Sequence, residues 1–213
     1  MVVLVAGGAG QVGRLLLPML LEAGHEARPT ARRREQADEL EALGAHPVAV
    51  DLEEDLPADL LDGVDAVVFT AGAGPGSGTP RKESVDFGAA VKLVEAAEAS
   101  RARRYVRVSA MGAADPSAGP ESMQPYLSAK ARADERLAAS GLAWTILRPG
   151  SLTDDAGTGR IAAAAPSLGR RGEIPREDAA RTVAACLEEP ATVGRTFEVL
   201  AGEDAISEAL RGL

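Results

Sequence analysis

A glycine-rich segment near the start of the sequence constrains the fold more than any other feature. It spans residues 7–13 (GGAGQVG) and lies between an apolar run, 2–6, and a helical pattern, 11–23. A strand, a glycine turn and a helix in this order leave the first N–H groups of the helix unpaired at the turn, where the helix dipole is positive. Glycine also allows the backbone to approach a ligand closely. The segment therefore predicts an anion site; a turn without a ligand is the alternative.

The glycines fit two known spacings at once. Gly8, Gly10 and Gly13 match G-x-G-x-x-G, and Gly7, Gly10 and Gly13 match the wider G-x-x-G-x-x-G. The first spacing, placed after a strand and before a helix, is typical of dinucleotide-binding proteins, in which the pyrophosphate rests on the helix N-terminus.

The rest of the chain alternates between two kinds of pattern. Short apolar runs predict buried strands, and longer amphipathic segments between them predict helices. This alternation indicates a parallel sheet with helices on both faces, which is the doubly wound α/β or Rossmann architecture. Binding sites in such folds lie at the carboxyl ends of the strands. The predicted strands are 2–6, 47–50, 66–69, 105–108 and 143–147, and the predicted helices are 11–23, 35–43, 85–99 and 124–140.

A single domain is expected, because 213 residues with 46% hydrophobic content suffice for one core. Beyond residue 150 the pattern becomes irregular, with a helix at 176–187, a strand at 197–200 and a helix at 206–210. Residues 151–213 are too few for an independent domain. We expect them to form a small C-terminal cap that shapes a substrate pocket over the sheet edge.

The segment after the second predicted strand indicates which dinucleotide is preferred. NAD-selective sites place an acidic residue on the ribose hydroxyls about 20 residues after the glycines. Here residues 28–34 read RPTARRR, and the first carboxylate, Glu35, follows three consecutive arginines. Guanidinium groups bind a 2′-phosphate, which a carboxylate would repel. The sequence favours NADP(H) over NAD(H), although a solvated basic start of the next helix is an alternative.

Asp51 follows the third predicted strand. At that end of the sheet its carboxylate could accept a hydrogen bond from the amine of an adenine. A helix N-cap explains an aspartate at this position equally well, and both interpretations stay open.

Tyr126 and Lys130 are the strongest candidates for chemistry. They lie four residues apart on a predicted helix, so their side chains share one face. An ammonium beside a phenol favours the tyrosinate, and we expect it to lower the pKa of Tyr126 from about 10 toward neutrality. Ser109, at the end of the strand 105–108, could hydrogen-bond a substrate oxygen near this pair. A serine at a strand end is also an ordinary turn residue.

The glycine turn, Ser109, the Tyr-x-x-x-Lys pair and the segment 147–150 (LRPG) together resemble the short-chain dehydrogenase/reductase superfamily. The likeness is greatest to its atypical and extended branches, which include NmrA-like regulators and epimerase/dehydratase-like proteins. It extends over nearly the whole chain, down to a late helix start at 176–180 (REDAA). Ala6 and Ala9 depart from the pattern, because threonines are common there.

The resemblance implies a role for each matching residue. The catalytic residues would be Ser109, Tyr126 and Lys130. Pyrophosphate contacts would come from Gly7, Gly10, Gln11, Val12 and Gly13, 2′-phosphate contacts from Arg32 and Arg33, and adenine contacts from Asp51 and Leu52. Ala71, Gly72, Ala73 and Lys130 would contact the nicotinamide ribose, and Pro149, Gly150, Ser151 and Leu152 would lie along the nicotinamide and substrate.

The sequence thus favours an NADP(H)-dependent oxidoreductase that reduces a small carbonyl, quinone or flavin-like acceptor. Tyr126 would protonate the oxyanion, Lys130 would lower its pKa, and Ser109 would orient the acceptor. A non-catalytic NADP(H)-sensing regulator is the second hypothesis. A nucleotide-sugar epimerase or dehydratase is the third, because the segment after Gly150 is short for a sugar-nucleotide domain.

Charge and composition limit the partners. The formal net charge of −9 argues against a nucleic-acid or anionic membrane surface, and no apolar stretch reaches the length of a membrane span. We expect a cytoplasmic protein, monomeric or weakly homo-oligomeric, with a small-molecule substrate and no metal site. The single cysteine, Cys186, fits the buried face of a helix.

Overall fold

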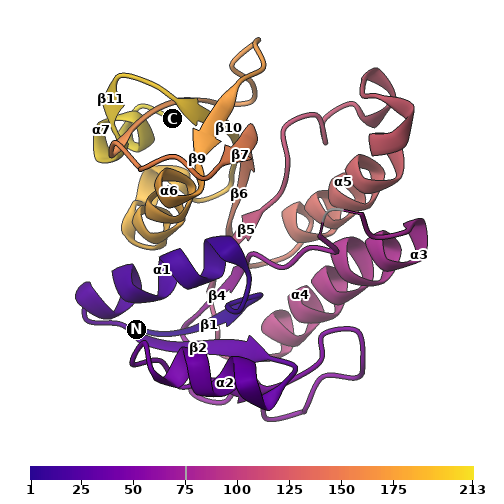
Figure 1. The fold of residues 1–213 in the computed structure, drawn as a ribbon, viewed down its shortest axis with the longest axis vertical. Coiled ribbons are helices and arrows are strands. Elements are labelled where there is room, and N and C mark those ends of the chain that lie inside the picture. Colours follow the sequence, from indigo (N-terminus) through magenta and orange to yellow (C-terminus); the bar gives the residue numbers. More distant parts are fainter. Residues whose placement is uncertain (75) are drawn as a thin grey trace.

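The computed structural model describes residues 1–74 and 76–213 and has a nine-stranded sheet at its centre (Figure 1). The strand order is β11-β8-β10-β6-β5-β4-β1-β2-β3, and neighbouring strands from β3 to β10 pair in parallel. The strands of this sheet are β1 (Val2–Ala6), β2 (Glu26–Ala31), β3 (Val48–Ala49), β4 (Ala66–Phe69), β5 (Arg104–Val108), β6 (Ala143–Pro149), β8 (Arg160–Ala164), β10 (Arg195–Ala201) and β11 (Asp204–Ala205). The predicted doubly wound Rossmann architecture is confirmed.

Helices cover both faces of the sheet (Figure 1). The α-helices are α1 (Gln11–Glu22), α2 (Arg34–Glu41), α3 (Thr79–Arg81), α4 (Ala90–Ala99), α5 (Gln124–Ala138), α6 (Arg176–Glu188) and α7 (Ile206–Arg211). A π-helix, η1 (Lys82–Ala89), joins α3 to α4, and the 3-10 turns are η2 (Pro116–Ala118), η3 (Glu121–Met123) and η4 (Pro190–Thr192). None of the helices in the described parts of the chain is long and apolar enough to cross a membrane.

Alternation along β1 explains why both faces are apolar. Val3 and Val5 belong to one core cluster with α1 and α6, whereas Leu4 and Ala6 belong to the opposite cluster with α4 and α5. Successive residues of a strand point to opposite faces, so a strand covered by helices on both sides must be apolar at every position. This is why the continuous apolar runs were informative in the sequence.

One helix begins earlier than the sequence predicted. The helix expected at 85–99 is preceded by α3 and η1, so helical structure starts at Thr79. Pro80 lies in the first turn, where it needs no N–H partner, and the carbonyl of Gly78 accepts from the N–H groups of Arg81 and Lys82 at 3.1 and 3.3 Å. The segment 71–80 is rich in glycine and proline, and its last two residues are helical; Pro75 within it lies outside the described residues.

After residue 150 the strand predicted at 197–200 is confirmed within β10, and the structure adds strands that the sequence pattern did not reveal. β8 and β10 pair antiparallel and extend the main sheet, while β7 (Ser151–Thr153) and β9 (Glu173–Pro175) form a separate parallel pair. Much of the expected cap is therefore sheet edge and helix, and only its first and middle parts reach toward the carboxyl ends of the central strands. β7, β8 and β9 are short and contain small or polar residues, so they lack the apolar run by which a strand is recognised.

The strand order determines where a ligand can bind. β1 is flanked by β2 on one side and β4 on the other. The chain therefore builds the sheet outward from β1 in one direction through β2 and β3, and then in the other direction from β4 onward. A crevice opens at such a switch point outside the carboxyl ends of the strands.

Candidate functional site

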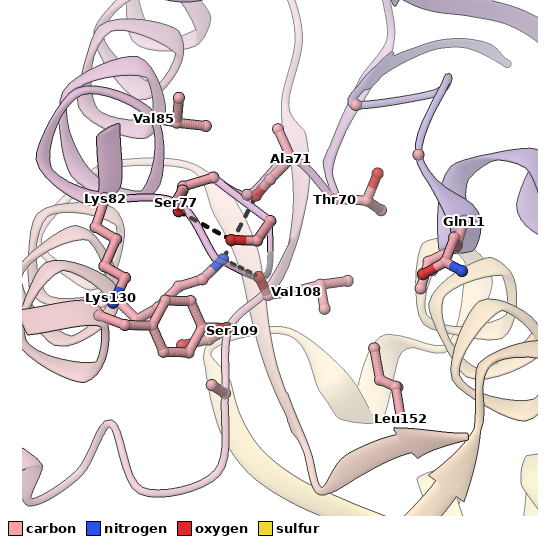
Figure 2. Close-up of a pocket in the computed structure, with 18 of the residues that line it drawn as sticks. Gln11, Thr70, Ala71, Ser77, Lys82, Val85, Val108, Ser109, Lys130 and Leu152 are labelled. Carbon is pink, nitrogen blue, oxygen red and sulfur yellow. Dashed lines mark hydrogen bonds between the residues drawn. The ribbon is translucent and has the colours of Figure 1, made fainter. Parts of the chain in front are cut away.

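A cleft of about 940 Å³ runs along the carboxyl ends of the central strands. Its size is within the usual range for cofactor and substrate sites. The predicted site residues that line it are Gly7, Gly10, Gln11, Val12, Arg32, Asp51, Leu52, Ala71, Gly72, Ala73, Ser109, Tyr126, Lys130, Pro149, Gly150, Ser151 and Leu152. Figure 2 shows Gln11 and Leu152 on one side and Lys82, Ser77 and Lys130 on the other. Gly13 and Arg33 are not among the lining residues.

The glycine turn has the geometry of an anion cradle. Gly7 has a φ of +89°, and a Cβ there would lie 2.6 Å from the Ala71 nitrogen, so only glycine fits. Gly13 lies beneath the turn, where a Cβ would be 2.4 Å from the Gly7 oxygen. Gly10 is the N-cap of α1 and no side chain caps this helix, so its first N–H groups are available to a ligand. The cradle fits the pyrophosphate of a dinucleotide, with Gly13 allowing close packing rather than contact.

The basic end of the cleft contains a carboxylate that the sequence analysis missed. Arg32 Nη1 lies 3.5 Å from Glu53 Oε2 and 3.9 Å from Asp51 Oδ2. Arg81 Nε lies 3.6 Å from the same Glu53 oxygen, and Ser84 Oγ donates to Glu53 Oε1 at 2.6 Å. Glu53 therefore bridges two arginines from different segments. The search for an acid covered only the end of β2, whereas this one comes from the loop after β3.

Two predicted residues near this end have local structural roles. Arg33 is exposed, and its backbone N–H donates to Gln36 Oε1 at 3.3 Å at the start of α2. Asp51 Oδ1 accepts from the Glu53 N–H at 3.0 Å. No helix begins in the described residues directly after Asp51, so the alternative of a helix N-cap is wrong, and the aspartate stabilises a turn instead.

Lys130 is held by buried oxygens. Its side chain is 4% exposed, and Nζ lies 3.1 Å from Asp86 Oδ1. It also donates to the carbonyls of Val108 and Ala71 at 3.3 and 3.4 Å (Figure 2). Asp86 Oδ2 accepts from the Ala73 N–H at 3.2 Å, so one carboxylate positions both the lysine and the loop after β4. Burial is the largest effect on Lys130 and lowers its pKa, and Arg107 lowers it further, while Asp86 opposes both.

The pKa of Tyr126 is shifted opposite to the sequence prediction. Its ring lies 5.7 Å from Lys130 Nζ, as the four-residue spacing implied. Burial nevertheless raises the pKa of Tyr126 well above 10.0, and the nearby carboxylates of Asp86 and Asp134 raise it further. The expectation that Lys130 brings the phenol toward neutrality is therefore wrong, because burial and the two carboxylates outweigh Arg107, the nearby cation that lowers the pKa. Tyr126 keeps its proton at neutral pH.

Both tyrosines are expected to resist ionisation. Burial raises the pKa of Tyr105 as well as that of Tyr126. Near-ultraviolet titration of the folded protein should therefore show no tyrosinate near pH 10, while the denatured chain ionises there. Because the pKa values of both tyrosines are higher in the folded than in the unfolded protein, ionisation of the unfolded chain favours unfolding at high pH. The tyrosines therefore cost no folding stability below about pH 10, and the free energy of unfolding falls as the pH rises above that value. A one-tyrosine step near pH 10 in the folded protein would contradict the prediction.

Ser109 belongs to a buried cluster of charged groups. Its hydroxyl donates to Asp134 Oδ2 at 2.8 Å. The same carboxylate binds Arg107 Nε at 3.0 Å and Arg148 Nη2 at 2.9 Å. Ser109 thus lines the cleft while its hydroxyl hydrogen is engaged in the hydrogen bond to Asp134. Its oxygen can accept a hydrogen bond from a ligand, but the hydroxyl has no free hydrogen to donate. The sequence marked Arg148 only as part of LRPG, and neither Asp134 nor Arg107 stood out.

The far wall of the cleft is fixed by close backbone packing. Gly150 lies against Gly172, where a Cβ would be 2.3 Å from the Gly172 oxygen. The Ser151 N–H donates to that oxygen at 3.0 Å, and the Met111 N–H donates to the Pro149 carbonyl at 2.9 Å. These contacts hold the start of β9 and the loop after β5 beside the end of β6.

The comparison with protein families agrees with this geometry. A family model described as NAD(P)H-binding matches residues 7–190, from the glycine turn to the start of η4. The chain belongs to this NAD(P)H-binding family. The matched region includes the cradle, the Tyr126 and Lys130 pair, and the Gly150 wall. Solved structures similar to this chain are described as an NAD-dependent epimerase/dehydratase and as an oxidoreductase.

Individual relatives cover the full chain. An uncharacterized sugar epimerase of Bacillus subtilis is 40% identical over 217 residues and covers 100% of both chains. A solved structure from Bacillus halodurans, described as a candidate NAD-dependent epimerase/dehydratase, has a TM-score of 0.95 and 38% identity over 100% of both chains. An oxidoreductase from Lactococcus lactis has a TM-score of 0.88 and 28% identity, covering 100% of this chain and 96% of that one.

Proposed function

We propose that this protein is an NADP(H)-dependent oxidoreductase that reduces a small carbonyl, quinone or flavin-like acceptor. The observation that carries the proposal is that Tyr126 and Lys130 line the same cleft as the glycine cradle. In the reductive direction the acceptor oxygen must gain a proton, and Tyr126 carries one at neutral pH, although its raised pKa makes it a weaker acid than an ordinary phenol. The family's NAD(P)H-binding description supports the cofactor class.

Each residue has a defined task in this proposal. Gly7, Gly10 and the first turn of α1 hold the pyrophosphate. When bound, the reduced nicotinamide supplies a hydride, that is, two electrons and one hydrogen nucleus. Tyr126 donates its phenolic proton to the acceptor oxygen and regains one from solvent. Lys130, fixed by Asp86, lies beside the tyrosine ring, and in its charged form it would stabilise the tyrosinate as it forms.

The preference for NADP(H) is proposed from the arginines at the basic end. A 2′-phosphate would replace Glu53 as the partner of Arg32 and Arg81, which are 45% and 43% exposed and so can be reached. Glu53 opposes this, because its carboxylate repels a phosphate and could instead accept from ribose hydroxyls. Asp51 Oδ2 also lies 3.9 Å from Arg32 Nη1, so two arginines face two carboxylates here. The proposed preference rests on the exposure of both guanidinium groups, which can turn from the carboxylates to a phosphate.

This preference predicts the outcome of a titration. Arg32→Ala should weaken NADPH binding about tenfold or more, since a charge-assisted contact is lost, and should change NADH binding little. Glu53→Gln should strengthen NADPH binding. Calorimetry with both nucleotides measures these effects, and Arg34→Ala, on a neighbouring residue whose side chain is 87% exposed, is the matched control. Equal losses for NADPH and NADH in Arg32→Ala would contradict the assignment.

The reductase proposal is tested by NADPH consumption. Incubation with a quinone such as 1,4-naphthoquinone should oxidise NADPH in proportion to the quinone added. Two similar proteins are described as epimerases, which is the reason for keeping an epimerase as the second candidate. An epimerase returns its cofactor to the starting oxidation state, so stoichiometric consumption separates the two reactions. A cofactor-sensing protein would bind NADPH and consume none with any acceptor.

A further inference from the structure

The cationic side chains that line the cleft fall into two groups. Four are paired with carboxylates: Arg32 with Asp51 and Glu53, Arg81 with Glu53, Lys130 with Asp86, and Arg176 with Asp154. Lys82 and Arg171 also line the cleft, but within residues 1–74 and 76–213 neither has an ion pair or a side-chain hydrogen bond. Two unpaired cations on the walls of one cleft indicate an anionic ligand.

Lys82 lies at the Tyr126 and Lys130 end of the cleft. It is the first residue of η1, four residues before Asp86, whose carboxylate binds Lys130. Figure 2 shows Lys82 on the same side of the cleft as Lys130 and Ser77. Lys82 is half-buried and lies on the same helix as Asp86, whose carboxylate is bound to Lys130.

Arg171 lies on the opposite wall, at the substrate side. The next residue, Gly172, is fixed against Gly150 and accepts the Ser151 N–H at 3.0 Å. Arg171 is therefore anchored beside the end of β6 by its backbone, while its side chain is exposed and free to reach a ligand. Figure 1 shows this β7 and β9 region facing α5 and α3 across the carboxyl ends of the strands.

The surface at this end of the cleft is apolar. Met111, Met123 and Leu127 line it, and Met123 is 42% exposed, which is high for a large hydrophobic side chain. Methionine adapts its shape to flat or irregular apolar ligands. The same end thus offers an apolar surface for a ring system and two cations for a negative group.

We infer that the acceptor is an amphipathic anion, an apolar ring system that carries a carboxylate or sulfonate. Met111 and Met123 contact the ring, and Lys82 and Arg171 bind the negative group and determine specificity. The inference rests on the proposed reductase function, because only a reductase would use this ligand as an electron acceptor. Binding of the anion can be tested without turnover.

A matched pair of unreactive probes tests the site. Naphthalene-2-sulfonate carries a charge, whereas naphthalene-2-sulfonamide has the same ring and is neutral. Calorimetry on the NADP⁺-loaded protein should give at least about tenfold tighter binding of the sulfonate, because charge-assisted contacts are worth about 1.5–3 kcal/mol. The double variant Lys82→Gln, Arg171→Gln should abolish this preference and leave sulfonamide and NADP⁺ affinity unchanged. Arg170→Gln, which removes an adjacent exposed cation outside the cleft lining, should retain it.

Three results would overturn the inference: equal binding of the two probes, a preference that survives in the double variant, or a double variant that loses NADP⁺ affinity instead. The last result would mean that the two cations bind the cofactor.

A turnover measurement separates this inference from the proposed function. If the anion preference is found and 1,4-naphthoquinone-2-sulfonate oxidises no NADPH, the reductase proposal fails and the anion site stands. If neutral quinones are reduced without any anion preference, the inference fails and the reductase proposal stands.

Discussion

Tyr126→Phe is expected to lower NADPH-dependent turnover by a factor of about 10² to 10⁴, the usual contribution of a positioned proton donor. The affinity for NADPH should stay nearly unchanged, because phenylalanine keeps the ring that lies 5.7 Å from Lys130 Nζ and removes only the hydroxyl. Burial and the neighbouring carboxylates keep that hydroxyl protonated at neutral pH. The acceptor oxygen then loses its proton source while the cofactor cradle is intact.

Steady-state NADPH oxidation and a parallel NADPH titration measure the two effects separately. Tyr105→Phe is the matched control, since the chain has two tyrosines and Tyr105 is fully buried in β5, away from the cleft lining. It should leave turnover unchanged. Turnover retained by Tyr126→Phe would remove tyrosine from the mechanism, and a loss of NADPH affinity equal to the loss of turnover would assign it to binding.

The features predicted correctly from the sequence are those determined by local pattern. The glycine turn is recognisable because a strand, a positive-φ glycine and a helix must follow one another in the chain, and Gly7 has that φ. The apolar runs revealed the strands because each is covered on both faces, so Val3 and Leu4 are equally buried. The Tyr126 and Lys130 pair lies on one helix face because four residues make about one turn.

The features missed depend on contacts between distant segments. Glu53 reaches Arg32 and Arg81 from a loop, and Asp86 reaches Lys130 from another helix. Neither acid lies at a fixed spacing from its partner, so no sequence window contains the pair. The direction of the Tyr126 pKa shift was wrong for the same reason, since local spacing revealed the lysine but not burial or the carboxylate of Asp86.

The short strands β7 and β9 escaped prediction for a different reason. β7 and β9 are three residues each, and they are held by the close packing of Gly150 on Gly172 rather than by an apolar run. The position of Arg171 in the cleft follows from this contact. Substrate-side residues therefore became visible only once the backbone path was known.

The second large effect is expected for stability, at Asp134. Its side chain is 3% exposed and binds Arg107, Arg148 and the Ser109 hydroxyl, and the Arg107 side chain is itself 1% exposed. Asp134→Asn should lower the free energy of unfolding by about 3–5 kcal/mol, because removal of one partner leaves a buried charge uncompensated. Arg107 cannot reach solvent to recover its hydration, which makes the loss larger than for a surface pair.

Chemical denaturation of Asp134→Asn and of Glu98→Gln provides the comparison. Glu98 binds Arg136, but their side chains are 33% and 31% exposed, so the loss should be about 1 kcal/mol or less. If Asp134→Asn does not fold, Arg148→Gln gives a milder test, because Asp134 would keep Arg107 and Ser109. A similar small loss for the Asp134 and Glu98 variants would mean that the cluster contributes no more than a surface pair. A large loss for Asp134→Asn alone would mean that the end of β5, and with it Ser109, is held in the cleft by this carboxylate.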